Sequence, residues 1–212
     1  MADFALVLSF ADAFRTTVII GACAAIFSML WGTTLFAITL APQRIFSLVV
    51  GAYVQVFRNI PVLVPLYLVY FGFPMIGLVW PAAVCGILAL VLQQGAYVSE
   101  ILRSAAKAID RSQQDAARSI GLSPWAVFRH VYLPQIAVYA LPALGNQSVL
   151  LVKDTSLLSA IAVVEVMMKA RLVVEGSGTV YLPFVIATAL YLVFVLAIDI
   201  VFALLGRRVR WK

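Results

Sequence analysis

The sequence has few charged residues. Asp, Glu, Lys and Arg make up only 11% of its 212 residues, whereas soluble domains carry roughly 25%. Hydrophobic residues make up 64%, and the mean hydropathy is +1.06. This composition excludes an ordinary soluble domain and indicates a chain that lies in a lipid bilayer.

Metal-binding and nucleophilic side chains are also scarce. The chain has two cysteines and one histidine. Cys23 and Cys85 fall inside apolar runs without metal-ligand spacing, so we predict that both are packing residues. His130 stands alone in a polar loop, where we expect a surface residue. We therefore expect neither catalytic residues nor a metal site in this chain.

A phosphate-binding motif is absent as well. No segment matches G-x-x-x-x-G-K-[ST], and no polar run is long enough to house a nucleotide-binding domain. If the protein uses ATP, another polypeptide has to bind and hydrolyse it.

Five apolar runs of about 20 residues or more predict five membrane-spanning helices. They lie near residues 14–40, 46–72, 79–98, 133–152 and 180–205. A sixth apolar stretch, residues 156–168, is about 13 residues long, which is too short to span a bilayer at 1.5 Å per residue. We predict that it is a half-helix or re-entrant segment packed inside protein.

The positive charges behind the net charge of +6 are placed unevenly. They follow the first span, crowd the connection after the third span and end the chain: Arg44; Arg103, Lys107, Arg111, Arg118 and Arg129; Arg207, Arg208, Arg210 and Lys212. Because Lys and Arg gather on the cytoplasmic side of membrane proteins, we predict an external N-terminus and a cytoplasmic C-terminus. The basic charge is thus a topology signal and does not indicate nucleic-acid binding.

The connection after the third span, residues 100–135, is the only long polar region. Ser112 followed three residues later by Asp115 has the spacing of a capping box, so we predict that a short helix begins there. Asn146 and Gln147, in the following span, are expected to form interhelical hydrogen bonds.

A sharp turn and a second short helix are predicted next in this connection. Gly121 stands where a helix end favours a left-handed residue, and Ser123 can cap a helix that has Pro124 at its first position. We expect two short helices, joined at the glycine, that project into the cytoplasm.

The order Asp115-Ala116-Ala117, Gly121, Leu133-Pro134 resembles the EAA motif of binding-protein-dependent ABC importer permeases. Asp115 replaces the usual Glu, and Ser112 stands where many relatives have Gly. The resemblance implies a coupling helix that fits a cleft of a separate ATPase subunit, with the coupling residues Asp115, Ala116, Ala117, Arg118, Gly121, Leu122 and Ser123. Small Ala side chains would also let a partner backbone approach closely. The alternative reading is a solvated loop.

Further segments resemble the polar amino-acid branch of these permeases. They are Tyr53, residues 57–61, 95–103, 133–135 and 153–157. Relatives usually read Arg-Gly-Thr-Pro where this chain has Arg58-Asn59-Ile60-Pro61.

This wider resemblance implies an all-α membrane protein with the type I ABC importer permease fold and residues 1–212 as one domain. The implied function is import of a polar amino acid, delivered by an extracytoplasmic binding protein, across the bacterial inner membrane. The implied partners are an ATP-binding subunit that holds ATP and Mg²⁺, and a second permease, identical or paralogous. The chain itself would not be an enzyme.

The first candidates for the substrate pathway lie in the second and third spans. A guanidinium exposed to lipid there would cost at least a few kcal/mol, so we expect Arg58 to face protein or a watery cavity. Pro61 removes a helical hydrogen bond and frees the carbonyl of Phe57. The candidates in these two spans are Arg58, Asn59, Tyr97 and Glu100. A buried ion pair would explain Arg58 equally well.

The second candidates lie around the short apolar stretch. Asp154 can cap a half-helix that begins at Ser156, and the positive end of that helix would attract a substrate carboxylate. Asp154 or Glu165 could then meet an amino group. A structural pair of Lys153 with Asp154 is the simpler alternative.

Two other functions compete with the importer. An ion-gradient-driven secondary transporter would need no cytoplasmic docking motif and would be expected to show an inverted repeat, which the sequence lacks. A membrane enzyme is disfavoured because local spacing assembles no metal cluster.

Overall fold

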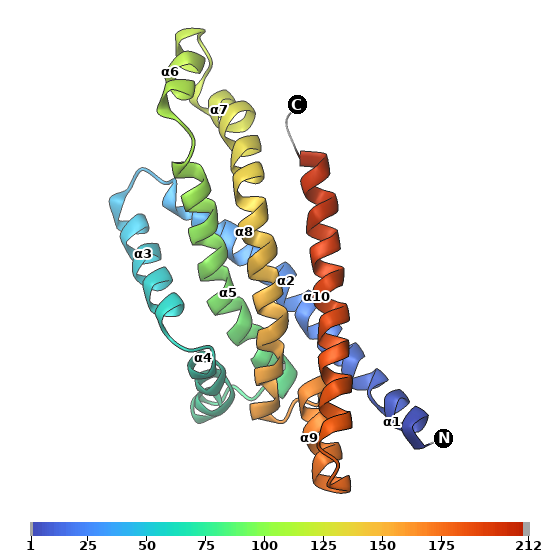
Figure 1. Ribbon diagram of the computed structural model, residues 1–212. Coiled ribbons are helices and arrows are strands. Elements are labelled where there is room, and N and C mark those ends of the chain that lie inside the picture. The colour runs from blue at the N-terminus through green and yellow to red at the C-terminus, as the bar shows by residue number, and fades with distance from the viewer. Residues whose placement is uncertain (1, 210–212) are drawn as a thin grey trace.

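The regular structure of the chain is helical throughout residues 2–209, the part that the computed structural model describes (Figure 1). Arg210 and Lys212, which belong to the basic tail, lie outside the described residues. The elements of the first half are α1 (Ala2–Ser9), α2 (Ala11–Thr39), α3 (Arg44–Asn59), α4 (Leu63–Tyr67), the π-helical turn η1 (Leu68–Gly72), the 3₁₀ turn η2 (Phe73–Ile76) and α5 (Ala82–Lys107).

The second half begins with the polar connection and ends in the most apolar of the long helices. Its elements are α6 (Arg111–Ser119), α7 (Pro124–Val127), the π-helical turn η3 (Phe128–Tyr132), α8 (Leu133–Asp154), the 3₁₀ helix η4 (Thr155–Ile161), α9 (Val166–Ser177) and α10 (Tyr181–Val209).

Four helical stretches of the described chain are long and apolar enough to cross a membrane. They are Leu6–Thr39, Ala82–Lys107, Pro124–Ile161 and Tyr181–Arg208. The predicted first, third, fourth and fifth spans are therefore confirmed, although the first begins earlier and the third ends later than expected. The bent pair α3 and α4–η2 supplies the fifth candidate span.

The second span is not the single helix that was predicted over residues 46–72. α3 stops at Asn59, and the segment that follows is bent away from it by 98°. Pro61 explains the break, because it cannot donate to Phe57 and it pushes Ile60 into the extended conformation, with φ −101° and ψ 145°.

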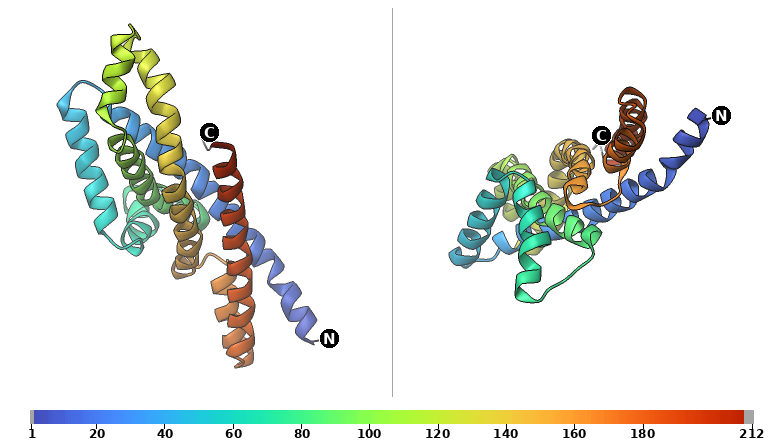
Figure 2. Two further views of the ribbon diagram at one scale, coloured as in Figure 1. Left: turned by 45° about the horizontal axis from the view of Figure 1, so that its top comes forward. Right: turned by 90° about the horizontal axis from the view of Figure 1, so that it is seen from below.

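The contact between α2 and α5 is the most extensive helix–helix contact in the protein. A Cβ on Gly32 would lie 2.5 Å from the Val98 Cβ and 2.6 Å from the Gly95 carbonyl oxygen, and one on Gly95 would lie 2.5 Å from the Trp31 ring. The two glycines let the backbones approach as closely as small residues do between other membrane helices. As a result α2 runs obliquely across the bundle, from the side of α10 to the side of α3 (Figures 1 and 2).

Residues 156–168 do not form one continuous half-helix, which was one of the two forms predicted for them. The 3₁₀ helix η4 ends at Ile161, the next residue, Ala162, has the positive φ of 60°, and α9 begins only at Val166. The prediction that this stretch packs inside protein is confirmed, because Leu158 and Ile161 are 1% and 2% exposed.

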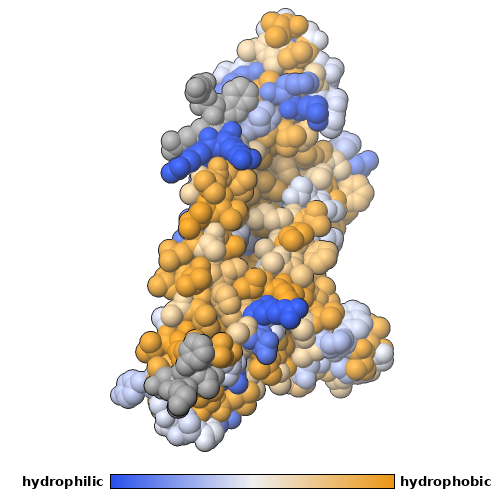
Figure 3. Space-filling view, turned by 90° about the vertical axis from the view of Figure 1, so that its right-hand side faces the viewer, coloured by the Kyte–Doolittle hydropathy of each residue, from blue (hydrophilic) through white to orange (hydrophobic). Residues whose placement is uncertain are grey.

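The surface on the side of α10 is apolar over most of its middle, and hydrophilic residues gather mainly toward the end that carries α6 (Figure 3). α10 has a row of apolar side chains that are about half exposed: Val185, Leu192, Val193, Leu196, Ile200, Val201 and Leu204. Such a surface suits contact with lipid tails, so the chain is a multi-pass membrane protein.

Candidate functional site

The polar connection between α5 and α8 forms a corner of two helices at one end of the molecule (Figure 1). Gly121 has φ +80°, as predicted, and its N–H donates to the Arg118 carbonyl at 2.9 Å while the Leu122 N–H donates to the Ala117 carbonyl at 3.2 Å. This pair of bonds closes the end of α6 in the way that a left-handed C′ glycine allows. Ser123 caps α7 as predicted, since its Oγ accepts the N–H of Ala126 at 3.3 Å.

The start of α6 differs from the predicted capping box. The N-cap is Asp110, whose carboxylate accepts the Ser112 N–H at 2.9 Å. This hydrogen bond lowers the pKa of Asp110 below its usual value. Ser112 therefore lies in the first turn of the helix, and Asp115 is an exposed residue in its middle.

α7 is not the separate helix that was expected to end near Leu133. It continues through η3 into α8, so that Pro124–Ile161 is one 38-residue stretch. The π-helical turn before Pro134 absorbs the change in hydrogen-bond register that a proline in a continuous helix requires.

α6 is tied to this long helix by two side-chain contacts. Gln135 donates to the Gln113 side-chain oxygen at 2.6 Å, and Tyr132 donates to that of Gln114 at 3.3 Å. The corner is therefore fastened to the helix that enters the membrane. His130 is exposed, as predicted, with its Nδ1 3.0 Å from the Ala126 carbonyl.

Most of the predicted coupling residues face outward on this corner. Ala117 is buried, and the others are exposed: Asp115, Ala116, Arg118, Gly121, Leu122 and Ser123. Two large apolar neighbours that we did not single out from the sequence are also exposed, Ile120 at 76% and Trp125 at 67%. Their places on either side of Gly121 could have signalled an apolar contact surface.

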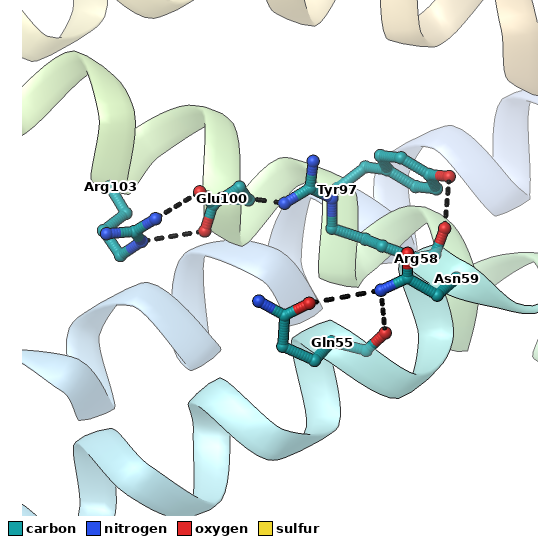
Figure 4. Close-up of polar contacts among 6 residues, drawn as sticks. All are labelled: Gln55, Arg58, Asn59, Tyr97, Glu100 and Arg103. Atoms are coloured by element: carbon teal, nitrogen blue, oxygen red, sulfur yellow. Dashed lines mark hydrogen bonds and ion pairs between the residues drawn. The ribbon is translucent and has the colours of Figure 1, made fainter.

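Three of the four candidates from the second and third spans, Arg58, Tyr97 and Glu100, meet where α3 passes α5 (Figure 4). The Arg58 guanidinium lies 3.7 Å from the Glu100 carboxylate and 5.5 Å from the centre of the Tyr97 ring. Arg103 also binds Glu100, through two guanidinium nitrogens. Arg58 keeps 36% of its side chain exposed, so it has N–H groups to offer to a ligand.

Asn59 belongs to the same region but points back along α3. Its side-chain amide donates to the backbone carbonyl of Gln55 at 2.6 Å and to the Gln55 side-chain oxygen at 3.1 Å (Figure 4). Asn59 thus closes the last turn of α3, and these hydrogen bonds do not connect it to Arg58, Tyr97 or Glu100.

A cavity of about 350 Å³ opens beside this cluster, between α2, α3 and α5. Its polar lining residues include Thr39, Ser47, Gln55, Ser99, Glu100 and Arg103. Glu100 therefore faces both Arg58 and this cavity. The volume falls within the range of small-molecule sites in proteins.

Asp154 lies in a different environment from the one predicted. Its carboxylate accepts from the Gln94 side chain at 2.8 Å, and Gln147 donates in turn to Gln94. It forms no side-chain cap for the helix that follows and no ion pair with Lys153 in the described part of the chain. The predicted interhelical role of Gln147 is confirmed, whereas Asn146 is exposed.

Glu165 is fully buried and caps α9. Its carboxylate accepts the N–H groups of Met167 and Met168 at 2.9 and 2.7 Å, and the hydroxyl of Tyr191 on α10. The Ser156 hydroxyl donates to the Lys153 carbonyl. Asp154, Ser156 and Glu165 are thus each held by hydrogen bonds within the protein.

Three polar contacts in the interior were missed by sequence reasoning. Two of them involve Gln93 and Gln94 on α5, which are 4% and 2% exposed. In the third, the Tyr53 hydroxyl accepts from the Trp31 ring N–H and donates to the Leu92 carbonyl. Glutamine inside an apolar span was the available signal, since polar residues there are costly unless they are paired. As for the two cysteines, both are free, and Cys85 is buried while Cys23 is partly buried.

A family model described as "Binding-protein-dependent transport system inner membrane component" matches residues 33–211. The chain belongs to this family. It is the membrane-spanning permease subunit of an ATP-binding-cassette importer, and ATP hydrolysis belongs to a separate subunit. The fold class predicted from the sequence is confirmed.

Individual relatives agree with this assignment. The permease is 34% identical over 193 residues to the nopaline transport system permease protein NocQ of Agrobacterium fabrum, covering 85% of this chain and 80% of NocQ. It is 34% identical over 187 residues to the probable amino-acid ABC transporter permease protein YckA of Bacillus subtilis, covering 88% and 77% of the two chains.

A solved structure shows the same architecture. It is described as the crystal structure of an amino acid ABC transporter with histidines, and it matches with a TM-score of 0.87 and 30% identity. The match covers 94% of the permease and 93% of that chain. The permease therefore shares its overall fold with a chain of that amino acid ABC transporter.

Proposed function

We propose that this permease imports a polar amino acid that an extracytoplasmic binding protein delivers. A partner ATPase that binds ATP and Mg²⁺ drives the transport, and a second permease, identical or paralogous, completes the pathway. The corner formed by α6 and α7 faces the ATPase on the cytoplasmic side of a bacterial inner membrane, and the N-terminus lies outside. Relatives described as amino-acid and nopaline permeases support the substrate class.

The exposed corner is the observation that carries this proposal. Ile120 and Trp125 present large apolar side chains on the most polar part of the chain, where exposed apolar residues rimmed by polar ones mark protein contact sites. The hydrogen bonds of Gln113 with Gln135 on α8 and of Gln114 with Tyr132 on η3 would transmit a displacement of α6 into the membrane. We propose that the six exposed coupling residues belong to this surface and that the buried Ala117 supports it from within.

Arg58, Tyr97 and Glu100 are proposed as the part of the pathway that holds the amino-acid backbone of the substrate. A guanidinium over an aromatic ring, with spare N–H groups, suits a carboxylate, and Glu100 suits an ammonium group. Asn59, Asp154, Ser156 and Glu165 support the walls of the pathway through the bonds described above. Alternating access then moves this site between the two sides of the membrane as the ATPase subunits close and open.

Uptake by the complete complex tests the proposed function. Proteoliposomes that contain the permease, its ATPase subunit and the binding protein are supplied with radiolabelled amino acids one at a time. We expect ATP-dependent uptake of a polar amino acid. Uptake that needs only a sodium or proton gradient would contradict the proposal and favour a secondary transporter.

The Arg58→Ala variant tests the site in the same assay. Losing a charge-assisted contact worth roughly 1.5–3 kcal/mol should raise the KM about 10- to 150-fold. Arg171→Ala, which removes an exposed arginine on α9, is the matched control and should leave the KM within about twofold. An unchanged KM in Arg58→Ala would remove Arg58 from the proposed site.

A further inference from the structure

The end of α3 leaves several backbone carbonyls without partners in the chain that follows. Phe57 would normally accept from residue 61, but Pro61 has no N–H, and the 98° bend carries the next residues away from Arg58 and Ile60. Because such carbonyls cannot be left to lipid, groups of the protein or water in a cavity have to satisfy them at membrane depth.

Two side chains of α5, one helical turn apart, supply these hydrogen bonds. Gln93 donates its side-chain amide to the Phe57 carbonyl at 3.1 Å and to the Ile60 carbonyl at 2.7 Å. Tyr97 donates its hydroxyl to the Arg58 carbonyl at 3.0 Å (Figure 4). Three carbonyls at the break, those of Phe57, Arg58 and Ile60, are thus held by one face of α5.

In the position where Gln93 makes these two hydrogen bonds, its own side-chain oxygen is left without a partner. The side chain is 4% exposed, and its Oε1 has no hydrogen-bond partner among the described residues. A buried amide oxygen left unpaired is unfavourable, and an apolar side chain of similar size would avoid that loss. The two N–H bonds to α3 are therefore what the amide contributes at this position.

We propose that Gln93 is a positioning residue that fixes Arg58 against Tyr97 and Glu100. Its two acceptors, Phe57 and Ile60, flank Arg58 in the chain, so they set the place of the Arg58 backbone. From that place the guanidinium lies over the Tyr97 ring and reaches the Glu100 carboxylate. The consequence for transport rests on the proposed function of Arg58, whereas the positioning itself does not.

Thiol labelling at position 58 tests the positioning without any substrate. The permease, in complex with its ATPase subunit and carrying Cys23→Ala and Cys85→Ala, receives Arg58→Cys and is treated with 2-sulfonatoethyl methanethiosulfonate. Adding Gln93→Met should raise the labelling rate about tenfold, because two hydrogen bonds that hold the end of α3 are lost. Gln93→Asn, a milder change that cannot reach both carbonyls, should raise it less.

Two controls separate positioning from general loosening. Gln94→Met removes the neighbouring, equally buried amide, which binds α8 and not α3, and should leave the rate at position 58 within about twofold. A thiol introduced by Glu175→Cys on α9, far along the chain and exposed, should react equally fast with and without Gln93→Met.

Either of two results would overturn the proposal. One is an unchanged labelling rate at position 58 in both Gln93 variants, which would show that the amide does not place Arg58. The other is an equal rise at positions 58 and 175, which would show that Gln93 only stabilises the bundle. If labelling changes as expected but Arg58→Ala leaves the KM for uptake unchanged, the positioning stands and the proposed role of Arg58 in transport fails.

Discussion

Asp110 is the N-cap of α6. Its side chain is exposed to solvent and accepts a hydrogen bond from the Ser112 N–H. Because its pKa is lower in the folded state than in the unfolded state, the cap stabilises α6 at pH values above the unfolded pKa of about 3.9. That stabilisation is lost as the pH falls through the folded pKa.

We therefore expect Asp110→Ala to speed hydrogen–deuterium exchange in α6 at neutral pH, because one of the free N–H groups of the first turn loses its acceptor. Asp110→Asn keeps an oxygen at the same place and should exchange like the parent protein. Exchange is measured by mass spectrometry on peptides that cover residues 111–119. Equal exchange in Asp110→Ala and the parent would show that the cap does not hold this helix.

Single residues of the corner show where sequence reasoning succeeds. Gly121 and Ser123 were placed correctly because a left-handed turn and a cap before proline depend on a few adjacent residues. Ser112 was misplaced because two possible caps stand two residues apart, and local chemistry does not choose between them. Gln93 was missed because its partners, Phe57 and Ile60, lie more than 30 residues away.

The crossing of α2 and α5 depends on glycines at the contact. Gly32→Ala would place a methyl group 2.6 Å from the Gly95 carbonyl, a backbone atom that cannot rotate away. We expect a loss of about 1–3 kcal/mol in stability, seen as a lower melting temperature of the detergent-solubilised permease. Gly51→Ala on α3 is the control, since nothing lies within 4 Å of the added methyl group. Equal melting of both variants would argue against close packing here.

The glycine at the corner between α6 and α7 sets the direction of α7. Nothing lies within 4 Å of a Cβ at Gly121, so the effect of a side chain comes from its φ of +80°, which costs roughly 1–2 kcal/mol for most residues and more for β-branched ones. We expect Gly121→Val to reduce uptake while ATP hydrolysis continues, and Gly121→Asn to retain uptake, because Asn tolerates the left-handed region. Both rates are measured in proteoliposomes. Wild-type uptake in Gly121→Val would remove the corner from the coupling path.

Whole elements could be predicted from the sequence where length and apolar composition decide them. α5, α8 and α10 were found in this way. The bend after α3 was not, because a proline in an apolar run is compatible with either a kink or a complete break, and the choice depends on what α5 offers to the freed carbonyls. The irregular path of residues 155–165 likewise depends on burial against other helices.

At the scale of the molecule, polar side-chain contacts connect the corner to the proposed site. Gln113 joins α6 to α8, and Gln114 joins α6 to η3, which leads into α8. Gln147 and Gln94 join α8 to α5, and Gln93 joins α5 to the end of α3 beside Arg58. A displacement of the corner would thus reach Arg58 through helices that are joined by directional bonds.

The proposed orientation places the corner and the loop after α9 on opposite sides of the membrane. In Figure 1 the two lie at opposite ends of the bundle. In a background of Cys23→Ala and Cys85→Ala, Ser119→Cys on α6 and Glu175→Cys on α9 each place one thiol on an exposed residue. Because positive charges gather in the cytoplasm, a membrane-impermeant maleimide added to intact cells should label only the second thiol. After the cells are opened it should label both. Labelling of the first thiol in intact cells would reverse the proposed orientation and place the corner beyond the reach of any cytoplasmic ATPase.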